Sequence, residues 1–232
     1  EILWQRELGQ SSAYLNYAGI NPLRRGGAVI TTASEAADKD DLISRVIRTD
    51  EQGRILWDRQ YPKPEMNFAI DALDNGSGLY VLANIMNANS RDPNLRLLHL
   101  NYEGEVLWDQ IFADQAVKIG TAIDILKGGD LVVSGAIGKH PMLDVWVARL
   151  SSDGKLIWSS TIDVGDPDNT LTVAALTSGE IAVAGGAGVS DEGQNTTGWV
   201  AWLDGNGEML ARMVLGDDQT EQFYGAIPLR GG

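Results

Sequence analysis

Short runs of apolar residues alternate with turns rich in glycine, aspartate and asparagine along the whole chain. Typical runs are AVITTA at 28–33, LYVLAN at 79–84 and VWVARL at 145–150. These runs are too short for helices and are rich in Val, Ile, Thr and Trp, which favour strands. Glycine in the turns supplies the positive φ that tight hairpins need. The pattern predicts an all-β chain of short antiparallel strands.

One phrase recurs along the chain: a glycine-containing turn, then an apolar pair, then tryptophan. The tryptophans are Trp4, Trp57, Trp108 and Trp158, and Ala211 takes the fifth place, at intervals of 50 to 53 residues. Each complete interval holds four runs of strand length. A repeat of four antiparallel strands near this length indicates a β-propeller blade, whereas the alternative, a β-helix or other solenoid, has shorter repeats. We therefore expect a β-propeller of four-stranded antiparallel blades.

The repeats are expected to form one propeller domain over residues 1–232, divided at 1–53, 54–104, 105–154, 155–207 and a partial 208–232. Runs at 2–8 and 222–229 would be the outer and inner strands of an incomplete blade beside four complete ones. Because an open ring exposes unpaired strand edges, the chain is expected to be part of a longer propeller of about six to eight blades. Self-association, or completion by another chain, is the alternative, and the mass of the native protein distinguishes them.

The side chains taper in the way that a wedge-shaped blade requires. Runs such as VVSGAIG and AVAGGAG are small and suit inner strands, whereas the strand with the Leu-Trp phrase is bulky and suits the outer edge. The tryptophans are therefore predicted to pack between neighbouring blades. Ala211 departs from this column, and we expect Trp199 or Trp202 to fill its space.

The spacing L-x-x-x-G-x-x-x-W resembles the repeat of bacterial quinoprotein-like (PQQ-type) propellers. It occurs twice in full, as Leu100, Gly104 and Trp108 and as Leu150, Gly154 and Trp158. The phrase GGDLVVSGA…DVWVARL is similar to the repeats of secreted bacterial propeller proteins. This resemblance spans essentially the whole chain and implies an architecture in which the repeated tryptophan holds blades together. It also implies a secreted, periplasmic or cell-envelope location.

The same resemblance implies that catalysis is absent, because many members of these families are scaffolds. The Ala and Thr that flank the quinoprotein docking motif are missing here, and the chain has no cysteine for the paired cysteines of quinoprotein alcohol dehydrogenases. Nucleophile elbows, phosphate-binding glycine loops and histidine-rich metal motifs are also missing from the sequence. Of the two histidines, His99 falls within a strand and His140 in a loop without an acidic neighbour. We therefore expect that the protein is not an enzyme and needs no cofactor.

Composition adds a strong acidic bias, with a formal net charge of −14. Like charge repels nucleic acids and anionic membrane surfaces, so neither is an expected partner. The absence of cysteine excludes disulfides and thiolate metal sites and fits an extracellular or periplasmic location. No apolar run approaches the length of about 18 residues that a membrane helix needs. The chain begins with Glu1 and shows no signal peptide, which suggests a processed chain or a fragment.

The long, variable connections of a propeller are expected on one face, which we call the loop face; the short turns lie on the opposite turn face. Loop-face connections are predicted at 9–16, 33–41, 61–67, 86–94, 113–118, 138–142, 163–170, 189–197 and 216–222. They hold 15 acidic residues against 5 basic ones. Either they form a docking surface for a basic partner or a cation, or they are simply solvated loops of an acidic protein. The candidate binding residues are Asp38, Asp40, Asp41, Asp191, Glu192, Asp217 and Asp218.

Calcium is the specific form of the cation hypothesis. Asp163, Asp166, Asp168 and Asn169 offer hard oxygen ligands within one short connection, although their spacing does not match a twelve-residue calcium loop. Asp71 and Asp124 share one column of the inner strand, where they would face the central channel or cap a strand. A carboxylate pair for glycoside hydrolysis is available in any acidic propeller.

The sequence therefore predicts a non-catalytic propeller that acts as a scaffold or binding module for a protein or glycan. The alternatives are a propeller enzyme domain, quinoprotein-like or carbohydrate-active, and a structural subunit of a larger assembly. An enzyme would be distinguished by an axial pocket with convergent polar groups.

Overall fold

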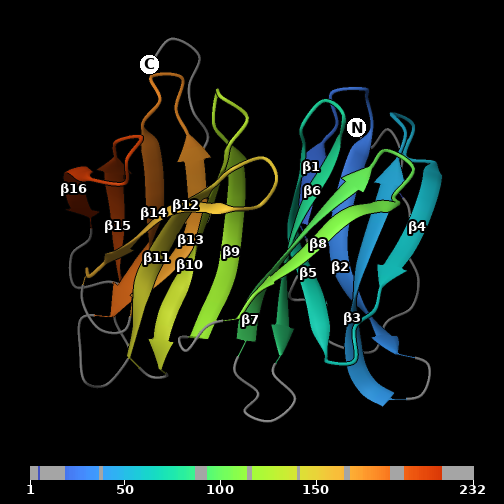
Figure 1. Ribbon diagram of the computed structural model, residues 1–232, viewed down its shortest axis with the longest axis horizontal. Coiled ribbons are helices and arrows are strands. Elements are labelled where there is room, and N and C mark those ends of the chain that lie inside the picture. The colour runs from blue at the N-terminus through green and yellow to red at the C-terminus, as the bar shows by residue number, and fades with distance from the viewer. Residues whose placement is uncertain are drawn as a thin grey trace. The chain divides into compact units, whose positions relative to one another are not determined.

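The computed structural model describes residues 5, 19–36, 39–86, 93–113, 117–139, 142–164, 168–188 and 196–215. The chain divides into two compact units, Glu1–Phe112 and Ala113–Gly232, and each is described by itself below. All regular structure in the described residues is β-strand, as Figure 1 shows. The all-β prediction is confirmed.

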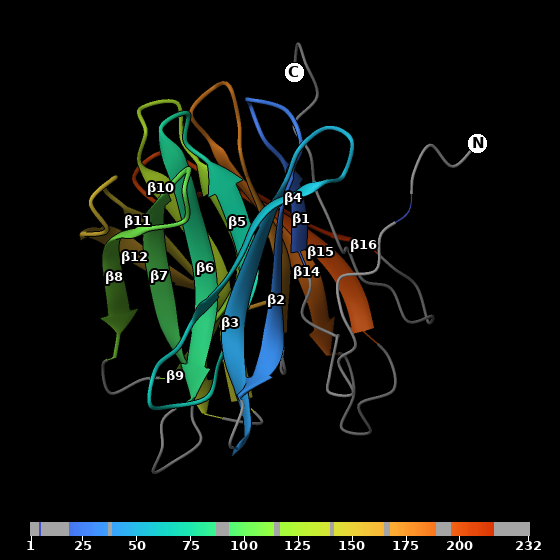
Figure 2. The same cartoon turned by 90° about the vertical axis from the view of Figure 1, so that its right-hand side faces the viewer.

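The first unit contains two four-stranded antiparallel sheets, whose strands follow one another in sequence order (Figure 2). The first sheet consists of β1 (Gly19–Pro22), β2 (Ala28–Ala36), β3 (Lys39–Thr49) and β4 (Ile55–Tyr61). The second consists of β5 (Asn67–Asp74), β6 (Gly78–Met86), β7 (Pro93–Asn101) and β8 (Val106–Phe112). Inner strand β5 packs against β1, β2 and β3 of the preceding sheet.

The second unit repeats this arrangement. One sheet consists of β9 (Val117–Ile125), β10 (Leu131–Lys139), β11 (Met142–Leu150) and β12 (Leu156–Ile162). The other consists of β13 (Asp168–Ala175), β14 (Ile181–Gly188), β15 (Thr196–Leu203) and β16 (Met209–Leu215). Here inner strand β13 packs against β9, β10 and β11. The four sheets are blades of a β-propeller, as the repeat predicts. The expected end strands at 2–8 and 222–229 lie outside the described residues.

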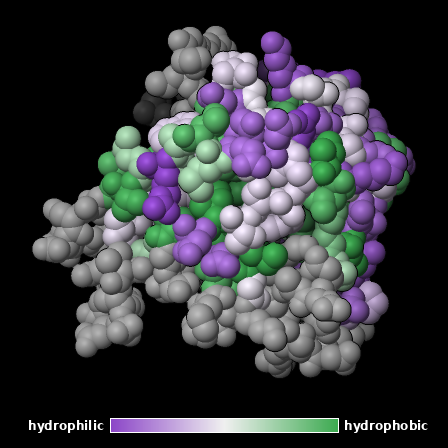
Figure 3. All heavy atoms as spheres, turned by 60° about the vertical axis from the view of Figure 1, so that its left-hand side comes forward, coloured by the Kyte–Doolittle hydropathy of each residue, from purple (hydrophilic) through white to green (hydrophobic). Residues whose placement is uncertain are grey.

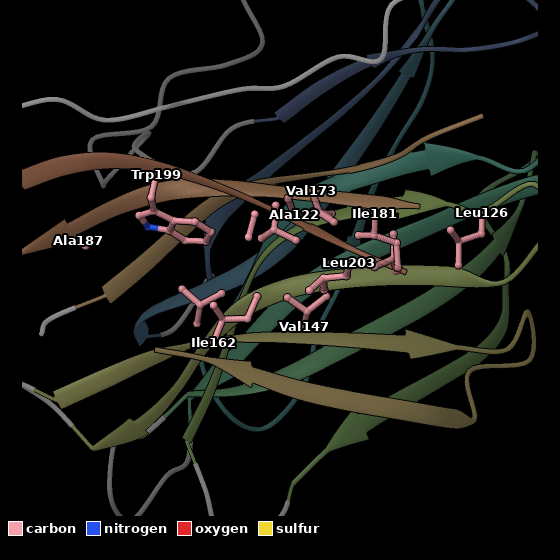
Figure 4. Close-up of a cluster of buried hydrophobic side chains, with 13 residues drawn as sticks. Ala122, Leu126, Val147, Ile162, Val173, Ile181, Ala187, Trp199 and Leu203 are labelled. Atoms are coloured by element: carbon pink, nitrogen blue, oxygen red, sulfur yellow. The ribbon is translucent and has the colours of Figure 1, made fainter. Parts of the chain in front are cut away.

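Two cores form between consecutive blades. In the second unit, Trp199 is completely buried and packs with Ala122 and Ile162, as Figure 4 shows. This cluster combines one face of the β9–β12 sheet with the facing side of the β13–β16 sheet. In the first unit, Val46 and Val81 belong to the equivalent cluster. Within each unit, the two blades thus bury apolar side chains against each other, and such burial is the main source of stability for a repeat.

Among the described residues, one turn structure occurs seven times at the short connections between strands. The first residue donates its N–H to the carbonyl of the residue four places later, and the glycine three places later donates back to its carbonyl. These turns begin at Leu23, Asp50, Asn101, Leu126, Ser151, Leu176 and Asp204. The glycines have φ between 71° and 95°. The turn between β5 and β6 is shorter, with Asn75 donating to Gly78.

In each unit, the tryptophan of the first blade packs on the turn of the second blade and donates a hydrogen bond to it. In the first unit, Trp57 Nε1 donates to the Tyr102 carbonyl at 2.8 Å, and Arg48 Nη1 donates to the same oxygen at 2.7 Å. The Tyr61 hydroxyl donates to the Gly104 carbonyl at 2.9 Å. Burial raises the pKa of Tyr61 to about 12, so this hydroxyl stays protonated and remains a donor.

The second unit contains the same contact. Trp158 Nε1 and Arg149 Nη1 donate to the Gly205 carbonyl at 3.0 and 2.8 Å. Ser160 Oγ donates to the Gly207 carbonyl at 3.0 Å and replaces the tyrosine hydroxyl of the first unit. The predicted role of the tryptophan column between blades is therefore confirmed for Trp57 and Trp158. We call this contact the turn clamp.

Ala211, which departs from the tryptophan column, lies opposite Trp202 in the β15–β16 pairing. Of the two side chains expected to fill its space, Trp202 is therefore the one that lies beside it. Trp199 pairs with Val214 instead and is part of the core between the blades.

Gly207 tests the turn clamp because it combines positive φ with a close tryptophan. A Cβ there would lie 2.7 Å from Trp158 Cε3, whereas at Gly179, which also has positive φ, nothing lies within 4 Å. Gly179→Ala is expected to lower the free energy of unfolding by about 1 kcal/mol through backbone strain alone. Gly207→Ala should cost at least about 1 kcal/mol more, because the indole must move. Urea denaturation measures both, and equal losses would contradict contact between the turn and Trp158.

Candidate functional site

The structure places the predicted acidic site residues as follows. Asp38, Asp166, Asp191, Glu192, Asp217 and Asp218 lie outside the described residues. Asp40 and Asp41 lie on β3, and Asp168 and Asn169 lie on β13, where their partners are Ala187 and Gly186 of β14. The prediction that these four residues belong to loops is wrong. The strands extend further toward the loop face than the apolar runs indicate, since backbone pairing continues through polar residues.

Asp163 is the one calcium candidate whose side chain is described, and it is exposed. Its main-chain carbonyl accepts a hydrogen bond from Arg212 Nη1 at 3.0 Å. Within the described ranges, no group of three His, Asp or Glu side chains is placed to hold a metal ion. The calcium site remains a prediction.

The 61–67 connection of the first unit is described in full, and a buried polar network lies beneath it. Arg96 on β7 is only 1% exposed. Its Nε and Nη2 donate to the two carboxylate oxygens of Asp109 on β8 at 3.0 and 2.9 Å. Its Nη1 donates to the Tyr61 carbonyl and to Asn67 Oδ1, both at 2.8 Å. Arg96 thus binds both ends of the 61–67 connection, Tyr61 and Asn67, from β7 of the second blade. We call these residues, with Lys63, the Arg96 network.

Two further groups complete the Arg96 network. Lys63, in the middle of the connection, places Nζ 2.9 Å from Asp109 Oδ2. Asn67 Oδ1 also accepts the main-chain N–H of Ser44, which belongs to the first blade. Burial alone would raise the pKa of Asp109, but hydrogen bonds from Arg96 and Lys63 outweigh it and hold the pKa of this carboxyl below its usual range. The carboxylate is therefore ionised and paired.

Sequence reasoning missed the Arg96 network, although the repeat contains a signal for it. Arg45 and Asp58 are partners across β3 and β4 at the same columns and form an equivalent pair in the first blade. At the column of Arg96, the second unit carries Trp146 and Trp199. An alignment of the repeats shows an arginine and an aspartate at the same two positions of the first and second blades. It does not show that the pair in the second blade is buried.

The inner-strand aspartates act as caps. Asp71 Oδ1 accepts hydrogen bonds from Ala72 N at 2.9 Å and Asn21 Nδ2 at 2.6 Å. Asp124 accepts the main-chain N–H of Ile125 and, at 2.8 Å, that of Ala175 in the next blade. Burial raises the pKa of Asp124, which the two backbone hydrogen bonds only partly oppose. These hydrogen bonds explain Asp71 and Asp124 as capping residues of the inner strands.

His99 lies on the face of the second blade in a small aromatic cluster. Its ring stacks on Tyr80 at 4.5 Å between centroids and lies 5.6 Å from Trp108. Asn75 Oδ1 accepts three hydrogen bonds from Ser77 and Gly78, which turns its Nδ2 toward His99 Nε2 at 3.0 Å. Nε2 must therefore be an acceptor, and the neutral ring carries its proton on Nδ1. Burial lowers the pKa of His99. It is held neutral as a structural group.

The pH dependence of folding should report this arrangement. The unfolded chain has the ordinary histidine pKa of 6.5, above the folded value, so it takes up the proton first as the pH falls. The stability present above pH 6.5 is therefore lost progressively below it. His99→Gln should remove this part of the pH dependence between pH 7 and 5. Urea midpoints at several pH values test this, and identical profiles for wild type and His99→Gln would contradict the assignment.

In the part of the chain that the structure describes, no helix is long and apolar enough to span a membrane.

Comparison with known proteins supports the fold. No protein-family model matches the chain, and no curated protein matches it in sequence. Among solved structures, puromycin hydrolase is 14% identical with a TM-score of 0.50, over 83% of this chain and 30% of that enzyme. An endo-arabinase from Bacteroides thetaiotaomicron VPI-5482 is 11% identical with a TM-score of 0.47, over 88% and 76% of the two chains. An exo-1,5-alpha-L-arabinanase from a bovine ruminal metagenomic library is 10% identical with a TM-score of 0.43, over 83% and 78%.

At these identities the likeness shows the fold alone, which is that of the β-propeller class. The chain spans about 30% of the length of puromycin hydrolase. The expectation that the protein is not an enzyme is nevertheless wrong as an inference from architecture. It assumed that blades of this kind belong to scaffolds, but puromycin hydrolase, an enzyme, shares this fold.

Proposed function

We propose that this chain forms the propeller part of a hydrolase and that the loop face of its first unit contacts the substrate. The similarity to puromycin hydrolase over 83% of this chain supports an enzymatic role. Its restriction to 30% of that enzyme supports a role as one part of a larger catalytic protein. Variable connections on a rigid scaffold are the usual place for substrate contacts in such folds.

The Arg96 network is the observation that carries this proposal. A buried ion pair is an inefficient way to stabilise a core, because desolvation offsets most of the attraction. The second unit has an apolar side chain in place of the ion pair, since Trp146 and Trp199 are buried at this column. In the first unit, the Arg96 network instead fixes both ends of the 61–67 connection and the position of Lys63. A fixed connection on the loop face is what a substrate-binding surface needs.

Histidine-based nucleophilic catalysis finds no support around His99, the one histidine within the described residues. Its Nε2 is engaged by Asn75, and its ring is stacked on Tyr80. The proposal therefore assigns substrate contacts, and not the nucleophile, to the first unit.

The test is a titration of the isotope-labelled chain with puromycin and, separately, with an arabinan oligosaccharide, followed by NMR. We expect puromycin to perturb the amides of residues 63–67, and Lys63→Met to weaken binding by about tenfold. Lys155→Met is the matched control, because Lys155 is an exposed lysine of the turn face paired only with Asp153. Perturbation of the turns, or equal affinity in the two variants, would contradict the proposal. If the oligosaccharide binds and puromycin does not, the substrate is a glycan and not a compound like puromycin.

A further inference from the structure

Two arginines of the first unit lie at the turn clamp without a carboxylate partner. On the face shown by the space-filling view, hydrophilic side chains lie between apolar patches (Figure 3). Several arginines of the described residues are paired with an aspartate: Arg45 with Asp58, Arg54 with Asp50, Arg96 with Asp109 and Arg149 with Asp130. Arg25 and Arg48, in contrast, form no ion pair within the described residues.

The second unit shows which group the first unit lacks. Arg149 uses Nη1 for the turn clamp, and its Nε and Nη2 donate to Asp130 Oδ2 at 2.9 and 2.6 Å. Asp130 is the last residue of the turn between β9 and β10. The corresponding residue of the turn between β1 and β2 is Gly27, where φ is 80° and a Cβ would lie 2.0 Å from the Thr49 carbonyl oxygen. The first unit thus has no carboxylate at this place, and its turn does not admit one.

Arg48 is the counterpart of Arg149 and has unused donors. Its Nη1 donates to the Tyr102 carbonyl, whereas its Nε is buried without a hydrogen-bond partner in the described part of the chain. Nη2 also has no hydrogen bond there, but it is not closed to solvent. Arginine keeps its charge in a protein, and a buried donor without a partner costs free energy that an anion would recover.

Arg25 adds a second positive charge at the same place. Its guanidinium carbon lies 4.1 Å from the centre of the Tyr102 ring, and that of Arg48 lies 5.0 Å from it. Arg25 is exposed. Asp74 is bound at the hydroxyl end of the ring by Tyr102 Oη and by two main-chain N–H groups. Glu51, in the turn between β3 and β4, pairs with neither arginine.

We propose that Arg48 and Arg25 bind a carboxylate group of a ligand, at the place that Asp130 occupies in the second unit. Nη2 of Arg48 is the donor that the carboxylate reaches first, and a planar guanidinium matches the geometry of a carboxylate. The site is on the turn face and is independent of the substrate contacts proposed for the loop face. Charges more than about 10 Å away are largely screened at about 0.1 M salt, so the two guanidinium groups outweigh the net charge of −14 here.

The Nε–H signals of the arginines, followed by NMR in the full chain, test this proposal. The probe is acetate, added against sodium chloride at constant ionic strength, with acetamide as the uncharged control. The Arg48 signal should shift and saturate with acetate and stay in place with acetamide. The Arg149 signal is the internal control and should not shift, because Asp130 already occupies its donors.

Two arginine variants separate the contribution of Arg25 from that of a surface charge in general. Arg25→Met keeps the turn clamp and removes the second charge, so the dissociation constant of acetate should rise by about threefold or more. Arg54→Met is the matched control, because Arg54 is an exposed arginine of the next turn that is paired with Asp50. It should leave the dissociation constant unchanged, and circular dichroism checks that both variants are folded.

An N-acetylated, C-amidated peptide with a single aspartate identifies the source of the carboxylate. If it binds more tightly than acetate, the ligand is an acidic side chain of a partner, and if it binds less tightly, the ligand is a small carboxylic acid. Any of four results would overturn the inference: no saturable shift of the Arg48 signal, an equal shift of the Arg149 signal, the same response to acetamide as to acetate, or a response to phosphate without one to acetate. Equal dissociation constants for Arg25→Met and Arg54→Met would remove Arg25 from the site.

Discussion

Replacing Asp109 with alanine is expected to lower the free energy of unfolding by about 3–5 kcal/mol, because it leaves a buried arginine without its carboxylate. Arg96 is 1% exposed and uses two of its nitrogens on Asp109. The remaining partners, the Tyr61 carbonyl and Asn67 Oδ1, are neutral oxygens and do not balance its charge. Urea denaturation followed by tryptophan fluorescence measures the loss.

Asp58→Ala is the matched control for this substitution. Asp58 forms the equivalent pair with Arg45, but the two side chains are 33% and 21% exposed. Water then screens the arginine left behind, and the expected loss is about 1 kcal/mol or less. A similar loss in the two variants would show that the Arg96 network is not the buried, charged structure described above.

The second large effect is expected for Trp158→Ala, with a loss of about 3 kcal/mol in the free energy of unfolding. The indole packs against the core of the second unit and against Gly207, and its N–H donates to the Gly205 carbonyl. Trp158→Phe keeps most of the apolar volume and loses the hydrogen bond, so about 1 kcal/mol should be lost.

Ile157→Ala controls for the position on the outer strand, because Ile157 is adjacent to Trp158 but 50% exposed. Its removal should cost less than about 1 kcal/mol. If the alanine variants at 157 and 158 lost equal stability, the turn clamp would contribute nothing beyond the burial of apolar area.

The architecture could be predicted because the same residue types recur at the same positions of each blade. Glycines such as Gly53 and Gly154 stand where the turn needs positive φ, and the tryptophan four residues later, Trp57 or Trp158, donates to the turn of the neighbouring blade. Local propensity and packing agree at these positions, so four copies of the pattern support one another. The strand ends were harder to predict, because Asp40 and Asp168 pair through their backbones, which the hydrophobic pattern does not register.

The Arg96 network shows where sequence reasoning stops. Arg96 and Asp109 are ordinary charged residues in the sequence, and the similar pair in the first blade is partly exposed. What buries Arg96 is the 61–67 connection, through Tyr61 and Asn67, whose positions depend on the packing of two blades. The inference against an enzyme was wrong for a different reason: a fold and the absence of familiar motifs do not decide function, and puromycin hydrolase, an enzyme, shares this fold.

The central claim is that Trp57 and Trp158 each hold the next blade of their unit by a hydrogen bond to its turn. The most direct measurement is the NMR coupling across that bond, together with hydrogen exchange of the indole N–H. We predict a resolved coupling from Trp57 Nε1 to the Tyr102 carbonyl carbon and from Trp158 Nε1 to that of Gly205, with slow exchange at both indoles. No coupling, and exchange at the rate of a solvent-exposed indole, would contradict the account.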